Sequence, residues 1–299
     1  MSLFLQIRIF TEIVRAGSIT GAADQLQIAK SAVSRRLQEL EARLGVQLMV
    51  RTTRQLNLTE AGEIFYERCL NVLAELEAAE DAVSETGRAL HGELRITAPE
   101  SYGLKHVVPV VLQFMNQYPQ MLINLDLTDR FVDIAREGFD LAIRVGSLQD
   151  STLRARRLSK VSLVVCASPD YFSRYGVPDT PDGLEQHICI RYSRLSNVHI
   201  WRYRDASGKH GQVRVPIRAL STSGDFIREA ALAGIGIILT PTFLVSEALQ
   251  TGRLVSVLNA YEWYESTLDQ SVYAVFPPGR HKSRRVRTFT EFLAQRLSS

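Results

Sequence analysis

Apolar residues recur with the period of an α-helix through the first part of the chain. Their spacing predicts a helix over 3–16, a short helix from Ser18 and a third helix from about Lys30. Ser18 suits an N-cap, because its hydroxyl can accept a hydrogen bond from a free amide at the helix start. Two short helices joined by a tight turn are typical of a helix-turn-helix, although an ordinary amphipathic hairpin has the same periodicity.

The third helix has an apolar side and a basic, donor-rich side that fits a DNA major groove. The side chains expected to contact DNA from it are Lys30, Ser31, Ser34 and Arg35. Beyond Gly45, two short apolar runs flank a basic tip, which predicts a small β-hairpin or wing. Arg51 and Arg54 on this tip could reach phosphates or a minor groove.

A long helix is predicted next, with Thr59 as its cap. Its apolar residues step by four and three, as in a coiled-coil seam. The seam comprises Phe65, Cys69, Val72, Leu76, Ala79 and Val83. A helix packed on its own domain is the alternative, but a lone helix with one apolar stripe needs a partner, so we expect dimerisation.

From Glu93 the pattern changes to alternating strands and helices, which predicts an α/β fold with two lobes and a cleft between them. We expect a short helix over 132–137 and a strand over 213–217. The expected domains are 1–58 for DNA binding, 59–89 for the linker helix and 90–299 for regulation. Within the last, one lobe takes about 90–163 with 269–299, and the other 164–268.

The charge distribution and the cysteine content indicate the kind of binding partner and the cellular compartment. The 299 residues carry a net charge of +3, but residues 1–58 hold eight Arg and Lys against four Asp and Glu. Residues 59–90 hold two Arg and Lys against eight Asp and Glu. A basic head suggests a polyanion partner. Three cysteines, no secretory leader and no membrane-length apolar run predict a reducing, cytoplasmic setting without membrane contact. The basic run 280–287 is expected to be solvated surface, and an extra contact to DNA or between domains is the alternative.

Enzyme motifs are missing from the sequence. It has no Gly-x-Ser-x-Gly, no His-Glu-x-x-His and no phosphate-binding loop, and its six histidines are scattered. We therefore expect no catalytic residues, no metal and no cofactor. The alternative is a catalytic triad whose residues are distant in the sequence and meet only in the folded protein. A transport binding protein would need an export signal. A thiol-based redox sensor using Cys166 and Cys189 is the nearer alternative.

The chain resembles the LysR-type transcriptional regulators along its whole length. The segments that carry the resemblance run through 16–26, 31–41, 44–46, 51–54 and 58–62, with weaker matches at 139–146 and 233–241. The resemblance implies a winged helix-turn-helix, a linker-helix dimer that assembles into a tetramer, and an effector domain like the periplasmic binding proteins. It implies double-stranded DNA, contacted also from Ser18 and Thr20, and a small-molecule coinducer as partners, with RNA polymerase as a further one.

This sequence departs from the family pattern at the start of its recognition helix. Ala29-Lys30-Ser31 stands where the family often has Ser-Gln-Pro, so Ala29 offers no side-chain cap. Lys30 replaces an amide that can read adenine, and lysine prefers guanine or phosphate.

The resemblance also implies effector-binding positions in the cleft. They are Ser101, Thr128, Arg144, Arg202 and Thr222. A hydroxyl at a helix start, with arginines as partners, predicts an organic anion, and first of all a carboxylate. Neighbouring Tyr102, Trp201 and Tyr203 suggest an aromatic acid. The alternatives are that Ser101 and Thr222 only cap helices and that the arginines pair with surface carboxylates.

Overall fold

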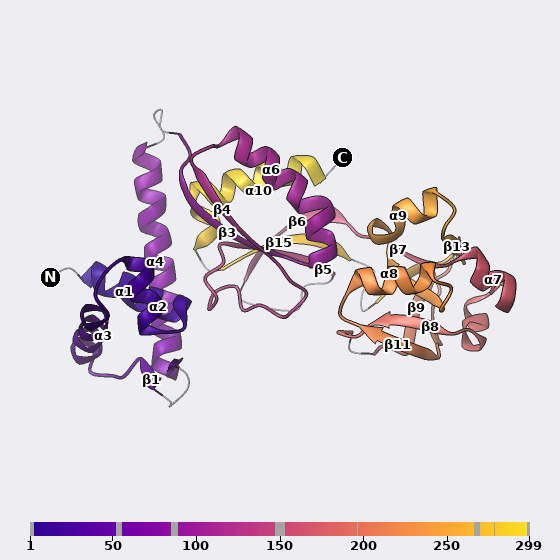
Figure 1. Cartoon of the computed structure of the whole chain (residues 1–299), viewed down its shortest axis with the longest axis horizontal. Coiled ribbons are helices and arrows are strands. Elements are labelled where there is room, and N and C mark those ends of the chain that lie inside the picture. The colour runs from indigo at the N-terminus through magenta and orange to yellow at the C-terminus, as the bar shows by residue number, and fades with distance from the viewer. Residues whose placement is uncertain are drawn as a thin grey trace.

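The computed structural model describes residues 3–51, 56–84, 89–146, 153–195, 197–265, 270–277 and 279–297. The chain forms a helical N-terminal domain, a long helix, and two α/β lobes that lie side by side (Figure 1). The described helices include none that is both long and apolar enough to cross a membrane.

The N-terminal domain packs three helices against a hairpin and the start of the long helix. Its elements are α1 (Leu3–Ala16), α2 (Ile19–Leu26), α3 (Lys30–Leu44), β1 (Met49–Arg51), β2 (Leu56–Leu58) and α4 (Glu60–Ser84). The Ser18 hydroxyl caps α2 by accepting a hydrogen bond from the Gly21 amide at 3.0 Å, and Ala29 gives α3 no side-chain cap. Thr59 Oγ1 accepts from the Gly62 amide at 2.9 Å at the start of α4. These caps agree with the sequence-based predictions.

The apolar stripe of α4 has two environments. In its first half, Cys69 is buried and Phe65 packs against the core of the N-terminal domain, so the alternative of a helix packed on its own domain holds there. Further along, Val72 and Leu76 are 51% and 38% exposed. The side chain of Val83 lies outside the described residues. The exposed half leaves an apolar surface for a partner.

The first lobe is a five-stranded sheet in the order β4-β3-β5-β15-β6. Its strands are β3 (Gly92–Ala98), β4 (Met121–Leu127), β5 (Leu141–Gly146), β6 (Arg154–Lys160) and β15 (Ser271–Phe276). Its helices are α5 (Glu100–Tyr102), the π-helical turn η1 (Gly103–Val107), α6 (Val108–Gln117), η3 (Arg280–Lys282) and α10 (Arg284–Leu297). β3 pairs in parallel with β4 and β5, as the βαβ pattern predicts, whereas β15 is antiparallel to its neighbours.

The second lobe holds a five-stranded sheet in the order β11-β8-β12-β7-β13 and a small sheet in the order β10-β9-β14. The strands of the large sheet are β7 (Leu163–Ala167), β8 (Cys189–Tyr192), β11 (Ile217–Ser221), β12 (Ile237–Pro241) and β13 (Val255–Val257). The small sheet comprises β9 (Ile200–Arg204), β10 (His210–Arg214) and β14 (Glu262–Tyr264). The helices are α7 (Pro169–Tyr175), η2 (Pro181–Gln186), α8 (Gly224–Leu232) and α9 (Thr242–Gln250).

Three sequence-based predictions need correction. The segment predicted as a helix over 132–137 is irregular at its start and forms turns over 134–138, because Gly138, with φ +73°, ends the coil after a single turn. The single strand predicted over 213–217 is two strands, since Pro216 has no amide to continue the ladder. The basic run is not wholly solvated: Arg280 is 5% exposed and pairs with Asp140 at 3.2 Å.

Candidate DNA interface and ligand cleft

The recognition helix α3 presents its polar side to solvent. Val33, Leu37 and Leu40 are buried in the N-terminal core. Lys30 and Ser31 are exposed, Ser34 is half-buried, and the side chain of Arg35 is 70% exposed. Thr20 on α2 is also exposed, while Ser18 serves as its cap. Thr20, Lys30, Ser31 and Arg35 are therefore available to a ligand outside the domain, whereas the Ser18 hydroxyl is engaged in the cap.

Glu39 binds two of the three arginines of α3, Arg35 and Arg36. Arg36 Nη1 donates to Glu39 Oε2 at 2.7 Å, and Arg35 Nε donates to Oε1 at 3.0 Å. These hydrogen bonds, that of Arg36 first, lower the pKa of the Glu39 carboxyl. The pair uses only Nε of Arg35, so its two Nη groups keep their donors for a base or a phosphate. The sequence analysis did not identify Glu39, although its spacing of four from Arg35 is a helical ion-pair signal.

The first strand of the hairpin is fixed to α3 by a second glutamate. Glu41 Oε1 accepts hydrogen bonds from the amides of Leu48 at 2.8 Å and Met49 at 3.2 Å. The hairpin itself pairs as predicted, with Met49 opposite Leu58. The side chain of Arg51 and all of Arg54 lie outside the described residues. The sequence pattern does not predict this role of Glu41, because its partners are backbone amides that lie beyond the turn after α3.

A cavity of about 280 Å³ lies between the two lobes. Ser101, Thr128 and Arg144 from the first lobe line it, so three of the five predicted effector positions come together. Arg202 and Thr222 are not among its lining residues. Arg202 lies on β9 in the small sheet and donates to the Glu265 carbonyl at 2.9 Å. Thr222 precedes Ser223, which is the residue that caps α8.

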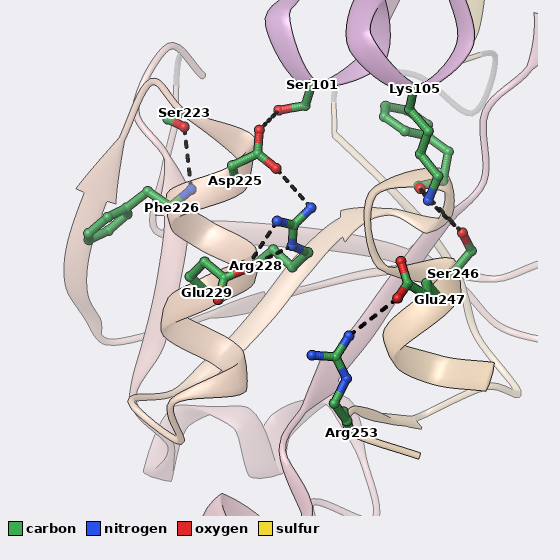
Figure 2. Close-up of polar contacts among 11 residues, drawn as sticks. Ser101, Lys105, Ser223, Asp225, Phe226, Arg228, Glu229, Ser246, Glu247 and Arg253 are labelled. Carbon is green, nitrogen blue, oxygen red and sulfur yellow. Dashed lines mark hydrogen bonds and ion pairs between the residues drawn. The ribbon is translucent and has the colours of Figure 1, made fainter. Parts of the chain in front are cut away.

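Two side-chain bridges join the lobes beside this cavity (Figure 2). Ser101 donates its hydroxyl hydrogen to Asp225 Oδ2 at 2.8 Å, and Asp225 also pairs with Arg228 at 2.8 Å. Lys105 Nζ donates to the Phe243 carbonyl at 2.8 Å and to Ser246 Oγ at 3.0 Å. Ser101 thus contacts a carboxylate of the opposite lobe in this arrangement.

The cavity contains more acidic than basic side chains. Asp129 and Glu265 line it with Arg144. Burial raises the pKa of both carboxyls, and burial lowers the pKa of the Arg144 guanidinium. Arg144 Nη2 donates to the Val132 carbonyl at 3.1 Å. Burying a charged side chain in this cavity is costly, so a bound group whose charge is opposite to that of its neighbouring side chain would be stabilised.

Aromatic rings line the cavity, but only one of the predicted three does so. Tyr102 lines it and meets Phe243 edge-to-face, with ring centroids 5.0 Å apart. Tyr192 is a further lining residue. Trp201 and Tyr203 instead pack in the core of the second lobe. The cavity can therefore accommodate an apolar body together with a few polar groups.

The geometry disfavours the redox alternative. Cys166 lies on β7 and Cys189 on β8, and β12 runs between these strands. Strands spaced ~4.8 Å apart put the two Cα atoms roughly 10 Å apart, beyond the reach of a disulfide. The two thiols also belong to separate cores on opposite sides of the sheet. Burial raises the pKa of each to about 12, which keeps them protonated and unreactive at neutral pH.

The fold and these surfaces define a two-part DNA-binding protein with a ligand-binding domain. Two family profiles match the chain: the bacterial regulatory helix-turn-helix protein of the lysR family at residues 4–63, and the LysR substrate binding domain at residues 87–298. The chain belongs to the LysR family of DNA-binding transcriptional regulators.

The chain is similar to known relatives and to solved structures over almost its whole length. The chain is 38% identical to an HTH-type transcriptional regulator of Xanthomonas campestris, covering 97% of this chain and 84% of that protein. It is 32% identical to the regulator CrgA of Neisseria meningitidis, covering 98% and 97%. The structure of CrgA superimposes with a TM-score of 0.62 over 99% of both chains at 30% identity. Full-length AphB, the Vibrio cholerae virulence activator, gives 0.61 over 99% of both chains at 29% identity.

Proposed function

We propose that this protein is a sequence-specific regulator, not an enzyme, whose binding to promoter DNA is controlled by a small molecule in the cleft between its lobes. The observation that carries the proposal is a cavity lined from both lobes, in the same chain as an exposed recognition helix. A ligand that touches both lobes can alter their relative position, which is how an effector would act at a distance.

Assembly and partners form part of the same proposal. The exposed half of α4 would pair two copies, and two such dimers would form a tetramer on duplex DNA. A dimer matches a DNA site with two related halves. RNA polymerase is the partner through which such a regulator would act, and the cytoplasm is where it would meet DNA.

The charges of the cleft refine the predicted organic anion. Arg144 is available to an acidic group, but Asp129 and Glu265 favour a hydrogen-bond donor or a cationic group. We therefore propose an organic acid that also carries an amine or a hydroxyl. Tyr102, Tyr192 and the apolar lining would hold its body, so an aromatic skeleton fits.

A thermal-shift screen with matched compounds tests this refinement. Each set shares one carbon skeleton and carries an acid only, an acid with an amine, or an amine only. We expect the compound with both groups to stabilise the full-length protein most. Arg144→Gln should weaken its binding by about 10-fold or more, because a charge-assisted hydrogen bond contributes about 1.5–3 kcal/mol. Asp129→Asn should remove the advantage over the plain acid.

The matched control is Arg253→Gln, which removes an exposed arginine whose partner is Glu247, outside the cleft lining. It should leave every shift unchanged. Stabilisation only by compounds without an acid group, undiminished in Arg144→Gln, would exclude the acidic effector.

A further inference from the structure

A second hollow lies where the N-terminal domain meets the first lobe. Its volume is about 810 Å³, and it shares no lining residue with the cleft. One side is the end of α1, with Val14, Arg15 and Gly17. The other side is Arg95 on β3 together with residues between 124 and 139. We call it the interdomain groove.

Four arginines line the interdomain groove, and they differ in their partners. Arg130 is neutralised by Glu137, which its Nη1 contacts at 2.7 Å, and by Asp126 at 3.7 Å. Arg136 is exposed, and the bonds described at this residue involve its backbone amide. Arg15 and Arg95 are the two that approach each other across the domain boundary.

The side chains of Arg15 and Arg95 both pass next to Gly138. A Cβ placed on this glycine would lie 2.8 Å from Arg15 Cγ and 3.0 Å from Arg95 Nη1. The nearest carboxylate to Arg15 is Glu12 at 3.8 Å, while the Arg95 guanidinium stands over the Phe139 ring at 5.4 Å. Within the described part of the chain, the Nε atoms of both arginines are buried without a hydrogen-bond partner.

This arrangement is incomplete without an anion. Buried donors without partners cost free energy, and the two arginines border one hollow from different domains. An oxyanion with several acceptor oxygens would supply hydrogen-bond acceptors to both arginines, since guanidinium donors match the geometry of phosphate.

We propose that the interdomain groove binds an oxyanion of the phosphate class between Arg15 and Arg95. Because Arg15 belongs to the DNA-binding domain and Arg95 to the first lobe, the bound anion joins the two. It adds to the contact nearby, where the Tyr66 hydroxyl of α4 donates to the Ala135 carbonyl at 2.8 Å. Binding of the anion is thus linked to the arrangement of the DNA-binding domain on the first lobe.

Titration of the full-length protein with inorganic pyrophosphate at constant ionic strength tests the site. The parent should show saturable binding, and Arg95→Gln and Arg15→Gln should each weaken it at least 10-fold. Arg95→Lys retains the charge and should retain part of the affinity, which keeps the test valid if Arg95→Gln folds poorly. Arg253→Gln, on the second lobe, should bind like the parent. No saturable binding by the parent, or equal affinity in the parent and both Gln variants, overturns the proposal.

A second arm identifies the source of the phosphate. Duplex DNA of arbitrary sequence is titrated at low salt with the parent and with Arg95→Gln. If the ligand is a free phosphorylated molecule, the duplex affinity is the same for both proteins. If the groove takes a backbone phosphate of DNA, the variant loses duplex affinity and pyrophosphate competes with the duplex. Whichever source the duplex titration indicates, the pyrophosphate titration alone decides whether the interdomain groove binds an oxyanion.

Discussion

At the scale of single residues, carboxylates hold two of the side chains that are predicted to bind a ligand, Arg35 and Ser101. Glu39 binds Arg35 through Nε and leaves its outer donors open. Asp225 takes the hydroxyl hydrogen of Ser101, so this serine joins the lobes in the described arrangement. Both roles depend on a carboxylate that a search for basic or hydroxyl residues passes over.

The residues of the cleft show what a single sequence can reveal. Ser101, Thr128 and Arg144 were predicted because the resemblance to the family carries these positions over. Glu265 was not, since the strand before it, β14, is only three residues long and its partner strand β9 is about 60 residues away in sequence. Asp129 carries no signal of its own beyond its place after Thr128.

The buried thiols give a prediction at this scale. All three cysteines have a pKa raised to about 12 by burial, so the reactive thiolate is scarce well above neutral pH. Raising the pH from 7 to 9 should leave the folded protein unreactive toward a disulfide reagent such as DTNB. In guanidinium chloride all three thiols should react. Rapid reaction of Cys166 or Cys189 in the folded protein would restore the redox alternative.

At the scale of elements, the long helix α4 serves two purposes along its length. Its first turns complete the core of the N-terminal domain, where Tyr66, Cys69 and Leu70 are buried. Its later turns expose Val72 and Leu76. The step of four and three in the sequence predicts one continuous seam, but periodicity alone does not tell which part faces its own domain.

Leu76→Glu tests the role of the exposed part. A charge in an apolar contact between two copies is costly to bury, so the variant should be monomeric at concentrations where the parent is a dimer or larger. Light scattering measures the mass. Glu67→Gln changes a charge on the opposite side of α4 and should leave the assembly unchanged. An intact assembly in Leu76→Glu would show that the copies meet elsewhere.

The local sequence pattern predicted the four helices α1 to α4 and failed where tertiary contacts decide the structure. The ends of α1 and the caps of α2 and α4 agree with the sequence, because they depend on neighbours within a few residues. Strand β6 was missed because an edge strand with Arg154, Arg156 and Arg157 lacks the expected apolar alternation.

At the scale of the whole molecule, several contacts among the described residues connect the DNA-binding half to the regulatory half, besides the approach of Arg15 to Gly138. Tyr66 reaches Ala135, and Lys282 pairs with Glu75 of α4. Gly279 approaches Ala74, where a Cβ would stand 2.9 Å from the alanine side chain. The basic run thus contributes a domain contact, which composition could not distinguish from solvated surface.

The cleft lies close to one of these contacts. Arg144, which lines the cleft, donates to the Val132 carbonyl, and the chain from Val132 leads within three residues to Ala135. A ligand that draws Arg144 into the cleft would release Val132. The proposed control of DNA binding by the cleft would therefore involve the segment 132–138, of which Asp133, Arg136 and Glu137 also line the interdomain groove.

Selection of random duplexes by the full-length protein tests the central claim most directly. The parent should enrich a motif with two related halves. Arg35→Ala should lose that motif, since a base-reading contact is worth about 1–3 kcal/mol of discrimination, whereas Arg43→Ala, an exposed arginine farther along α3, should keep it. No enriched motif with the parent, or the same motif with Arg35→Ala, would contradict sequence-specific recognition by α3.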